Sequence, residues 1–192
     1  MKTTHHLTHQ HRNARGKKKQ LGQFSIELAL TIAIGAIVLA GIIYYVTKGR
    51  HNEEVNTEAS NLTTMIGGAQ KLYGSDPTAF ASVTAAALIN NGVVPSSEVN
   101  GTAITSSFGT PITVAPATLY TANDAISFTY GVPPGLCSDF VTSSAGNLAK
   151  ITVGGTTVLD STASKPLNEA ALGTACSGSA GANVAVVATA TR

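Results

Sequence analysis

The sequence is organised around residues 17–27, KKKQLGQFSIE, where a basic leader gives way to a long apolar run. No charged residue occurs from Leu28 to Val46, and Glu27 stands alone at the head of this run. A helix from Phe24 to Val46 would measure about 34 Å, enough to cross the hydrocarbon core of a bilayer. A carboxylate costs roughly 2.5–3.5 kcal/mol at the bilayer centre on insertion scales, so Glu27 is expected to need a cationic partner.

A cationic partner arises if the chain is cut after Gly22. The new α-amino group of Gln23 then lies four residues before Glu27, about one helical turn away on the same face. In an array of packed copies, the carboxylate of one chain can meet the amine of the next.

This stretch resembles the class III signal of type IV prepilins, which combines a basic leader, a Gly before the cut, a Glu five residues into the mature chain and an apolar helix. The resemblance implies that a prepilin peptidase cleaves between Gly22 and Gln23 and methylates the amine of Gln23. It also implies that Glu27 is the glutamate used in assembly. Gln23 departs from the family pattern, in which Phe or Met is commoner at the first mature position.

The charge of the chain is concentrated in the leader. The 192 residues carry a formal charge of +2, and six of the twelve Lys and Arg lie in residues 1–22, which contain no acid. The remaining chain has six basic against ten acidic residues, a net charge of −4. This balance does not favour a nucleic-acid-binding protein. The basic leader instead predicts that the N-terminus stays in the cytoplasm and the C-terminal part is exported.

A stripe of apolar residues predicts that the helix continues beyond the membrane. Steps of four and three residues place on one face Val55, Ala59, Leu62, Ile66, Ala69 and Tyr73. Most of the charged residues of this segment are expected off this stripe, among Glu53, Glu54, Glu58 and Lys71. Gly74-Ser75-Asp76-Pro77 predicts the end of the helix, which would then reach about 76 Å from Gln23 to Tyr73.

The rest of the chain is expected to form a globular head of α+β class. After a second helix at 78–91, short β-branched runs between Gly and Pro turns predict strands at 102–105, 112–114, 125–130, 149–153, 156–159 and 184–189. Short helices are expected at 133–147 and 167–175. One long helix followed by a mainly antiparallel sheet is an α+β fold. The chain thus divides into a cleaved leader (1–22), a transmembrane and assembly half-helix (23–46), an amphipathic half-helix (47–76) and a head (77–192).

Cys137 and Cys176 are the only cysteines. If they lie outside the cytoplasm a bridge between them can persist, and closing a loop of about 40 residues would stabilise the fold by about 4 kcal/mol in the chain-entropy model. Two free buried thiols are the alternative. Type IV pilins typically have a C-terminal bridge, so the resemblance implies a Cys137–Cys176 disulfide.

Other, less specific features of the sequence resemble the type IVb branch of the family. They are the long leader and two runs, FGTPITV at 108–114 and GLCSDF at 135–140. Within that branch they are similar to the thin-pilus major pilins of conjugative plasmids and enterobacteria.

No catalytic, cofactor-binding or metal-binding residue is predicted. After the cut, His51 is the only histidine, so a Ser–His or Cys–His catalytic arrangement would have to use it. No nucleophile motif in the sequence points to this residue. The chain has no glycine-rich phosphate loop and no metal-ligand spacing beyond the cut. The scattered acids could form a carboxylate pair in the fold, but we expect them to be solvated at the surface, namely Asp124, Asp139, Asp160 and Glu169. We therefore do not expect an enzyme.

The expected function is that of a major structural subunit of a pilus used in adhesion, aggregation or conjugative mating contact. Implied partners are copies of the chain, the prepilin peptidase, an inner-membrane assembly machinery with its ATPase and an outer-membrane secretin, but no nucleic acid. The precursor would lie in the bacterial inner membrane before entering an extracellular filament. The alternatives are a minor pilin, a secretion pseudopilin, or a signal-anchored periplasmic enzyme or binding protein.

Overall fold

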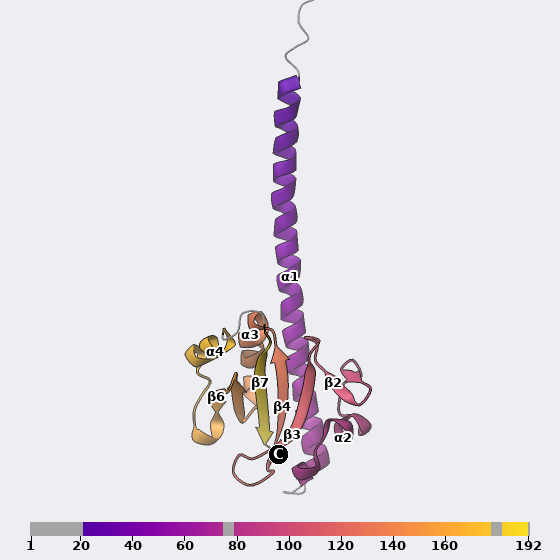
Figure 1. Ribbon diagram of the computed structural model, residues 1–192, viewed down its shortest axis with the longest axis vertical. Helices are drawn as coiled ribbons and strands as arrows, with labels where there is room; N and C mark the ends of the chain where they lie inside the picture. Colours follow the sequence, from indigo (N-terminus) through magenta and orange to yellow (C-terminus); the bar gives the residue numbers. More distant parts are fainter. Residues whose placement is uncertain (1–20, 75–78, 178–181, 192) are drawn as a thin grey trace, which may run out of the picture. The chain divides into compact units, whose positions relative to one another are not determined.

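The computed structural model describes residues 21–74, 79–177 and 182–191 (Figure 1). Most of the predicted leader therefore lies outside the described residues. The chain divides into two compact units between Thr47 and Lys48. In the first unit the described residues are all helical, whereas the second holds the remainder of that helix and the head.

Helix α1 (Leu21–Tyr73) is continuous through both the apolar run and the amphipathic stripe. It ends where the Gly74 N–H donates to the Gln70 carbonyl at 2.7 Å. The other residues predicted to end it, 75–77, lie outside the described part of the chain. In the second unit, one face of α1 is buried in the core through Val55, Ala59, Leu62, Met65, Ile66 and Ala69. The long helix predicted from the sequence is confirmed.

The predicted position of Glu58 on α1 is wrong. We expected this residue off the apolar stripe, but its side chain is fully buried. Glu58 lies three residues after Val55 and four before Leu62, so its spacing places it on the buried face beside Ala59.

The head contains an antiparallel sheet in which the described strands run in the order β1-β2-β3-β4-β7-β5-β6. Their bounds are β1 Val99–Asn100, β2 Ala103–Thr105, β3 Pro111–Ala117, β4 Ala125–Val132, β5 Lys150–Val153, β6 Thr156–Asp160 and β7 Val184–Thr191. All six predicted strands form. The two-residue strand β1 was not predicted, because it is too short to show an alternating pattern.

The C-terminal strand β7 lies in the middle of the sheet rather than at an edge. It pairs with β4 along eight residues, from Ala125 opposite Thr191 to Val132 opposite Val184, and with β5 on its other side. The Gln70 side chain of α1 donates to the Thr191 carbonyl at 2.8 Å, which ties this helix to the end of β7. The α+β class is therefore confirmed, with α1 packed on an antiparallel sheet.

The prediction of one continuous helix at 78–91 is wrong. The structure has a 3-10 helix η1 (Ala79–Ser82) and then a separate helix α2 (Ala85–Asn90). Thr84 is extended and its side chain accepts a hydrogen bond from the Ala87 N–H, so it begins a new helix instead of continuing the first.

The two later helices lie close to their predicted positions. They are α3 (Pro134–Ser144), which runs into the 3-10 helix η2 (Ala145–Asn147), and α4 (Glu169–Cys176). Asn168 caps α4 by accepting a hydrogen bond from the Ala171 N–H at 3.0 Å. A third 3-10 turn, η3 (Ser161–Ala163), follows β6.

Candidate functional site

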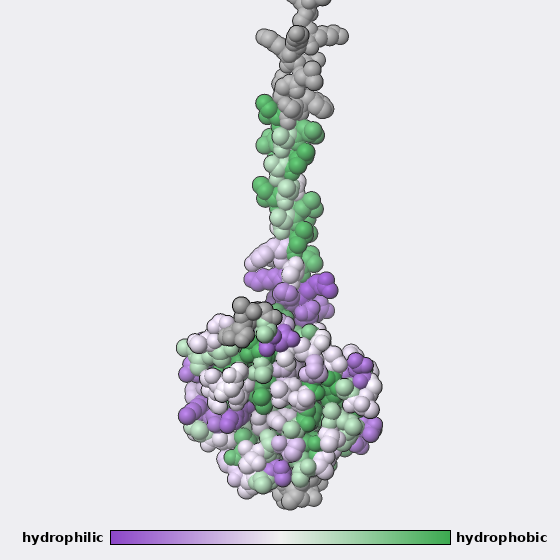
Figure 2. Space-filling view, in the orientation of Figure 1, coloured by the Kyte–Doolittle hydropathy of each residue, from purple (hydrophilic) through white to green (hydrophobic). Residues whose placement is uncertain are grey.

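The first candidate site is the apolar segment of α1. Along Ile26–Val46 the following side chains are each more than half exposed: Ile26, Leu28, Leu30, Ile32, Ile34, Ile37, Val38, Leu39, Ile42, Ile43, Tyr44, Tyr45 and Val46. The mean hydropathy of its most apolar 18-residue window is 2.5, and by length and composition this helix can cross a membrane. Figure 2 shows the hydrophobic side chains of this segment. An exposed apolar surface of this extent marks a site of contact with a membrane or with another protein.

Glu27 lies at the start of this segment and is exposed. Within the described residues it forms no ion pair, and the neighbouring Thr31 hydroxyl donates to the carbonyls of Glu27 and Leu28 rather than to the carboxylate. Gly22 and Gln23 lie in the first turn of α1. The proposed roles of Gly22, Gln23 and Glu27 therefore remain predictions.

Cys137 and Cys176 form the predicted disulfide. Their Cα atoms are 5.6 Å apart, and the bridge joins α3 to α4 across 39 positions of sequence. Both residues belong to the hydrophobic core. The bridge therefore fixes the two helices against the sheet from inside the head.

A pair of buried carboxyl groups forms a second candidate site. Glu58 on α1 and Glu98, directly before β1, have exposed fractions of 0% and 2%. The Ser107 N–H donates to Glu58 Oε2 at 2.6 Å, and Asn61 Nδ2 donates to Glu98 Oε1 at 2.5 Å. Three buried oxygens have no hydrogen-bond partner, namely Glu58 Oε1, Glu98 Oε2 and the Tyr130 hydroxyl.

The protonation of this cluster differs from that of surface acids. Burial raises the pKa of Glu58, although hydrogen bonds from Ser107 and with Glu98 act in the opposite direction. Burial and then the negative charge of Glu58 raise the pKa of Glu98 to about 7. Burial also raises the pKa of Tyr130 well above its ordinary value.

Our reading of the sequence missed this cluster. One signal was available, since the spacing of Glu58 from Val55 and Leu62 places an acid on the apolar face of α1. Nothing in the sequence marked Glu98, because its burial depends on a partner 37 residues away, Asn61.

The scattered acids do not all lie at the surface as predicted. Asp139 and Glu169 are exposed, but Asp160 is half-buried and Asp124 is buried. Asp124 accepts hydrogen bonds from three backbone N–H groups between β3 and β4, those of Leu119, Tyr120 and Thr121. Burial opposes the charge of Asp124, but these donors outweigh it and hold the pKa of the carboxyl below its ordinary value.

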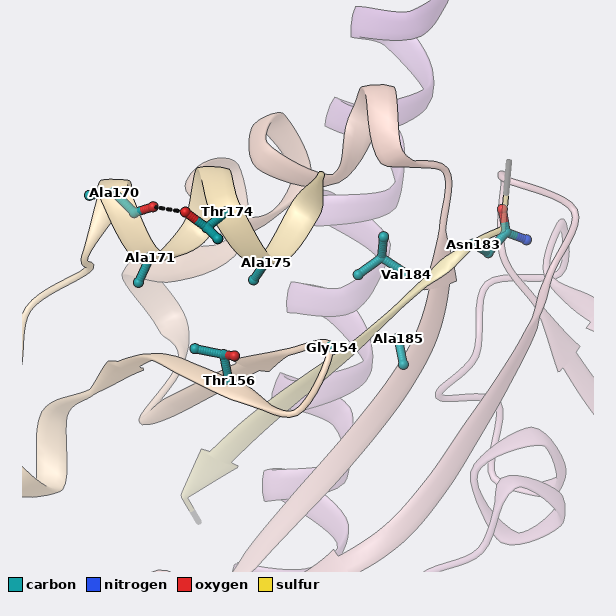
Figure 3. Close-up of a pocket in the computed structure, with 9 residues that line it drawn as sticks. All are labelled: Gly154, Thr156, Ala170, Ala171, Thr174, Ala175, Asn183, Val184 and Ala185. Carbon is teal, nitrogen blue, oxygen red and sulfur yellow. Dashed lines mark hydrogen bonds between the residues drawn. The ribbon is translucent and has the colours of Figure 1, made fainter. Parts of the chain in front are cut away.

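The head also has a surface hollow of about 710 Å³ between α4, the β5–β6 turn and β7 (Figure 3). Its lining consists of Gly154, Thr156, Ala170, Ala171, Thr174, Ala175, Asn183, Val184 and Ala185. The Thr174 hydroxyl is engaged with the Ala170 carbonyl at 3.1 Å. None of these lining residues has a titratable side chain.

Comparison with known proteins identifies the family. The family model described as PilS N terminal matches residues 52–190. Among solved structures, the chain is similar to TcpA, a type IV pilin from Vibrio cholerae El Tor biotype, with 18% identity and a TM-score of 0.53 over 72% of this chain and 99% of that one. No curated protein matches. At this identity the likeness to TcpA concerns the fold.

The family match covers most of the head and the part of α1 from residue 52, and the structural likeness covers 72% of the chain. Together these findings assign the chain to structural subunits rather than to enzymes. The chain belongs to the PilS family, has the fold of a type IV pilin and is a pilus subunit.

Proposed function

We propose that this chain is the major structural subunit of a type IVb pilus. In this proposal the peptidase cuts between Gly22 and Gln23, the amine of Gln23 is methylated, and the apolar segment of α1 packs against the same segment of other copies. The filament then serves adhesion, aggregation or mating contact outside the cell. The thin-pilus relationship rests on the long leader and the runs at 108–114 and 135–140.

The observation that carries this proposal is the exposed apolar segment with one acid at its head. As a precursor, the chain can cover the segment with the lipid of the inner membrane. Once it leaves the bilayer, only apolar segments of other copies offer a comparable environment. Each burial of a large aliphatic side chain from water is worth about 1.5–3 kcal/mol, so an uncovered segment would be strongly unfavourable.

Glu27 would set the register of this packing. A carboxylate buried without a partner in an apolar bundle is strongly destabilising, whereas one paired with an amine is tolerated. Among the described residues Glu27 has no such partner in its own chain. The amine of a neighbouring Gln23 would supply one, and misregistered packing would leave the acid unpaired.

Export requires partners that act on the membrane-anchored precursor. We place the prepilin peptidase and an ATP-driven assembly machinery at the inner membrane, and a secretin at the outer membrane. The assembled material is then extracellular, and the head surfaces face the medium.

The decisive experiment compares Glu27→Ala with Glu53→Ala, a change of another exposed acid on α1 beyond the apolar segment. Both variants should accumulate as folded, cleaved subunits. Sheared surface filaments should be lost or greatly reduced for Glu27→Ala and normal for Glu53→Ala. Normal filaments from Glu27→Ala would overturn the role of this carboxylate.

Processing is tested separately by the intact mass of the mature protein. The mass should correspond to loss of residues 1–22 and gain of one methyl group, and a Gly22 substitution should keep the leader attached. Wild-type protein that retains its leader would contradict the proposal. High abundance in sheared filaments supports a major subunit, whereas a trace amount would assign a minor pilin or pseudopilin.

A further inference from the structure

The buried carboxyl groups of Glu58 and Glu98 join three parts of the head. Glu58 belongs to α1, Glu98 directly precedes β1, and Ser107 lies in the turn between β2 and β3. Hydrogen bonds of 2.6 Å and 2.5 Å hold one oxygen of each carboxyl, from the Ser107 N–H and from Asn61 Nδ2. This cluster is the main polar connection between α1 and residues 98–107, and we call it the carboxyl joint.

One oxygen of each carboxyl group in the carboxyl joint lacks a hydrogen-bond partner. These oxygens are Glu58 Oε1 and Glu98 Oε2, and the two carboxyl groups are close enough for each to shift the pKa of the other. If both groups were ionised, two negative charges would adjoin in the core. If one group is protonated, its O–H can donate a hydrogen bond to the other carboxyl group, so that both oxygens have a partner.

Within the described residues, neither carboxyl forms an ion pair with Lys, Arg or His. The Asn61 amide from α1 and the Ser107 N–H donate to the pair, and the Tyr130 hydroxyl from β4 is close enough for the charges of both carboxyl groups to raise its pKa. Ser107 also lines a surface hollow together with the charged residues Arg50, Glu53 and Glu54.

We propose that Glu58 and Glu98 share a single proton, and that this proton stabilises the contact between residues 98–107 and α1 in a pH-dependent way. The inference concerns the fold of the head and does not depend on the proposed mode of filament assembly. The proton provides the hydrogen bond between the carboxyl groups, and its loss leaves an uncompensated pair of charges in the core.

The direction of the pH dependence follows from the raised pKa. Glu98 has a pKa of about 7 in the folded head and an ordinary value of 4.5 when the joint is open and solvated. The closed joint therefore binds the proton more tightly than the open one. Its stabilisation is complete below about pH 4.5, declines as pH rises, and is lost as pH passes through about 7.

Residues 98–107, which the carboxyl joint connects to α1, include the short edge strands β1 and β2. Among the described strands, β2 pairs with β3 at two positions, Ile104 with Ile112 and Thr105 with Pro111, and β1 pairs with β2 alone. Short edge strands of this kind open at a lower free energy than central ones. An alkaline shift should therefore loosen residues 98–107 while β4 and β7 stay paired.

Hydrogen exchange measured by mass spectrometry tests the proposal on the full-length protein in detergent micelles. Protection of peptides that cover 98–107 is compared at about pH 5 and about pH 8 after correction for intrinsic exchange. We expect this protection to fall in the wild type by at most about 70-fold, the limit set by pKa values of about 7 and 4.5. Peptides from β4 and β7 should keep their protection.

Two variants separate the joint from a general effect of pH. Glu98→Gln keeps an acceptor for Asn61 and supplies a permanent donor to Glu58, so residues 98–107 should remain protected at both pH values. Glu53→Gln, at an exposed position, should behave as the wild type. Equal protection of the wild type at both pH values would overturn the proposal, as would an alkaline loss in Glu98→Gln equal to that of the wild type.

A titration of the wild type keeps the test independent of how well the variants fold. With ¹³C-labelled Glu side chains, NMR should resolve the titration of the six Glu carboxyl groups, and Glu98 should titrate near neutral pH. All six groups ionised by about pH 5.5 would contradict a shared proton. Alkaline protection that requires added Ca²⁺ and disappears with a chelator would show that a cation, not a proton, bridges the pair.

Discussion

The contact between α1 and the segment after α2 can be tested with two adjacent glycines. A β-carbon at Gly68 would lie 2.4 Å from Val93 Cγ1 and 3.1 Å from Val93 Cγ2. A β-carbon at Gly67 would meet nothing within 4 Å. Both positions lie inside α1, so Gly67→Ala is a matched control for Gly68→Ala in helix propensity.

The two substitutions should have different effects on the free energy of unfolding. Each gains up to about 1 kcal/mol because Ala is a better helix former than Gly. Gly68→Ala must also displace the branched side chain of Val93, which has little χ1 freedom, and overpacking of this kind typically costs about 1–3 kcal/mol. We therefore expect Gly67→Ala to be more stable than Gly68→Ala by about 1–3 kcal/mol.

Denaturant unfolding of the full-length protein in micelles provides the assay. The chain has five Tyr and no Trp, so tyrosine fluorescence and circular dichroism are the probes. Adding Val93→Ala to Gly68→Ala should restore part of the lost stability, beyond the sum of the two single effects. Equal stability of the two glycine variants would refute the close approach of Gly68 to Val93.

Two further predictions concern the head. Reduction of the Cys137–Cys176 bridge should lower the free energy of unfolding by about 4 kcal/mol, the loop-entropy value for its 39-residue separation. The double Cys→Ala variant should lose at least as much under oxidising denaturant melts, and no loss in either case would contradict a structural bridge. Asp124→Ala should speed amide exchange at Leu119–Thr121 and lower the melting temperature, because three N–H groups lose their acceptor. Its stabilisation exists above the ordinary pKa of Asp and disappears as pH falls through the lowered pKa, so a variant that matches the wild type at neutral pH but not in acid would contradict this account.

Local patterns predicted much of this fold. The charge-free run ending at Val46 and the stripe from Val55 to Tyr73 predicted one long helix, since the period of apolar residues reports directly on helix faces. β-branched runs between turns predicted six strands to within a few residues. The disulfide was implied by the family resemblance and is present.

Local hydrogen bonds to polar side chains explain two of the errors. The helix predicted at 78–91 divides at Thr84, where the side chain caps a new helix instead of continuing the old one. Asp124 was expected at the surface, but the turn between β3 and β4 wraps three N–H groups around it. In both cases a polar side chain competes with regular structure for backbone hydrogen bonds, which composition alone does not predict.

The sequence by itself therefore determined the long helix, its apolar half with the lone Glu27, and the α+β class, because these depend on residues close together in the chain. Only the tertiary structure decided that β7 lies between β4 and β5, and that Glu58 and Glu98 meet in the core. The hydrogen bonds that position this pair span 37 and 49 residues. The burial that raises the pKa of both carboxyl groups is created when these distant segments pack together, so no local pattern contains it.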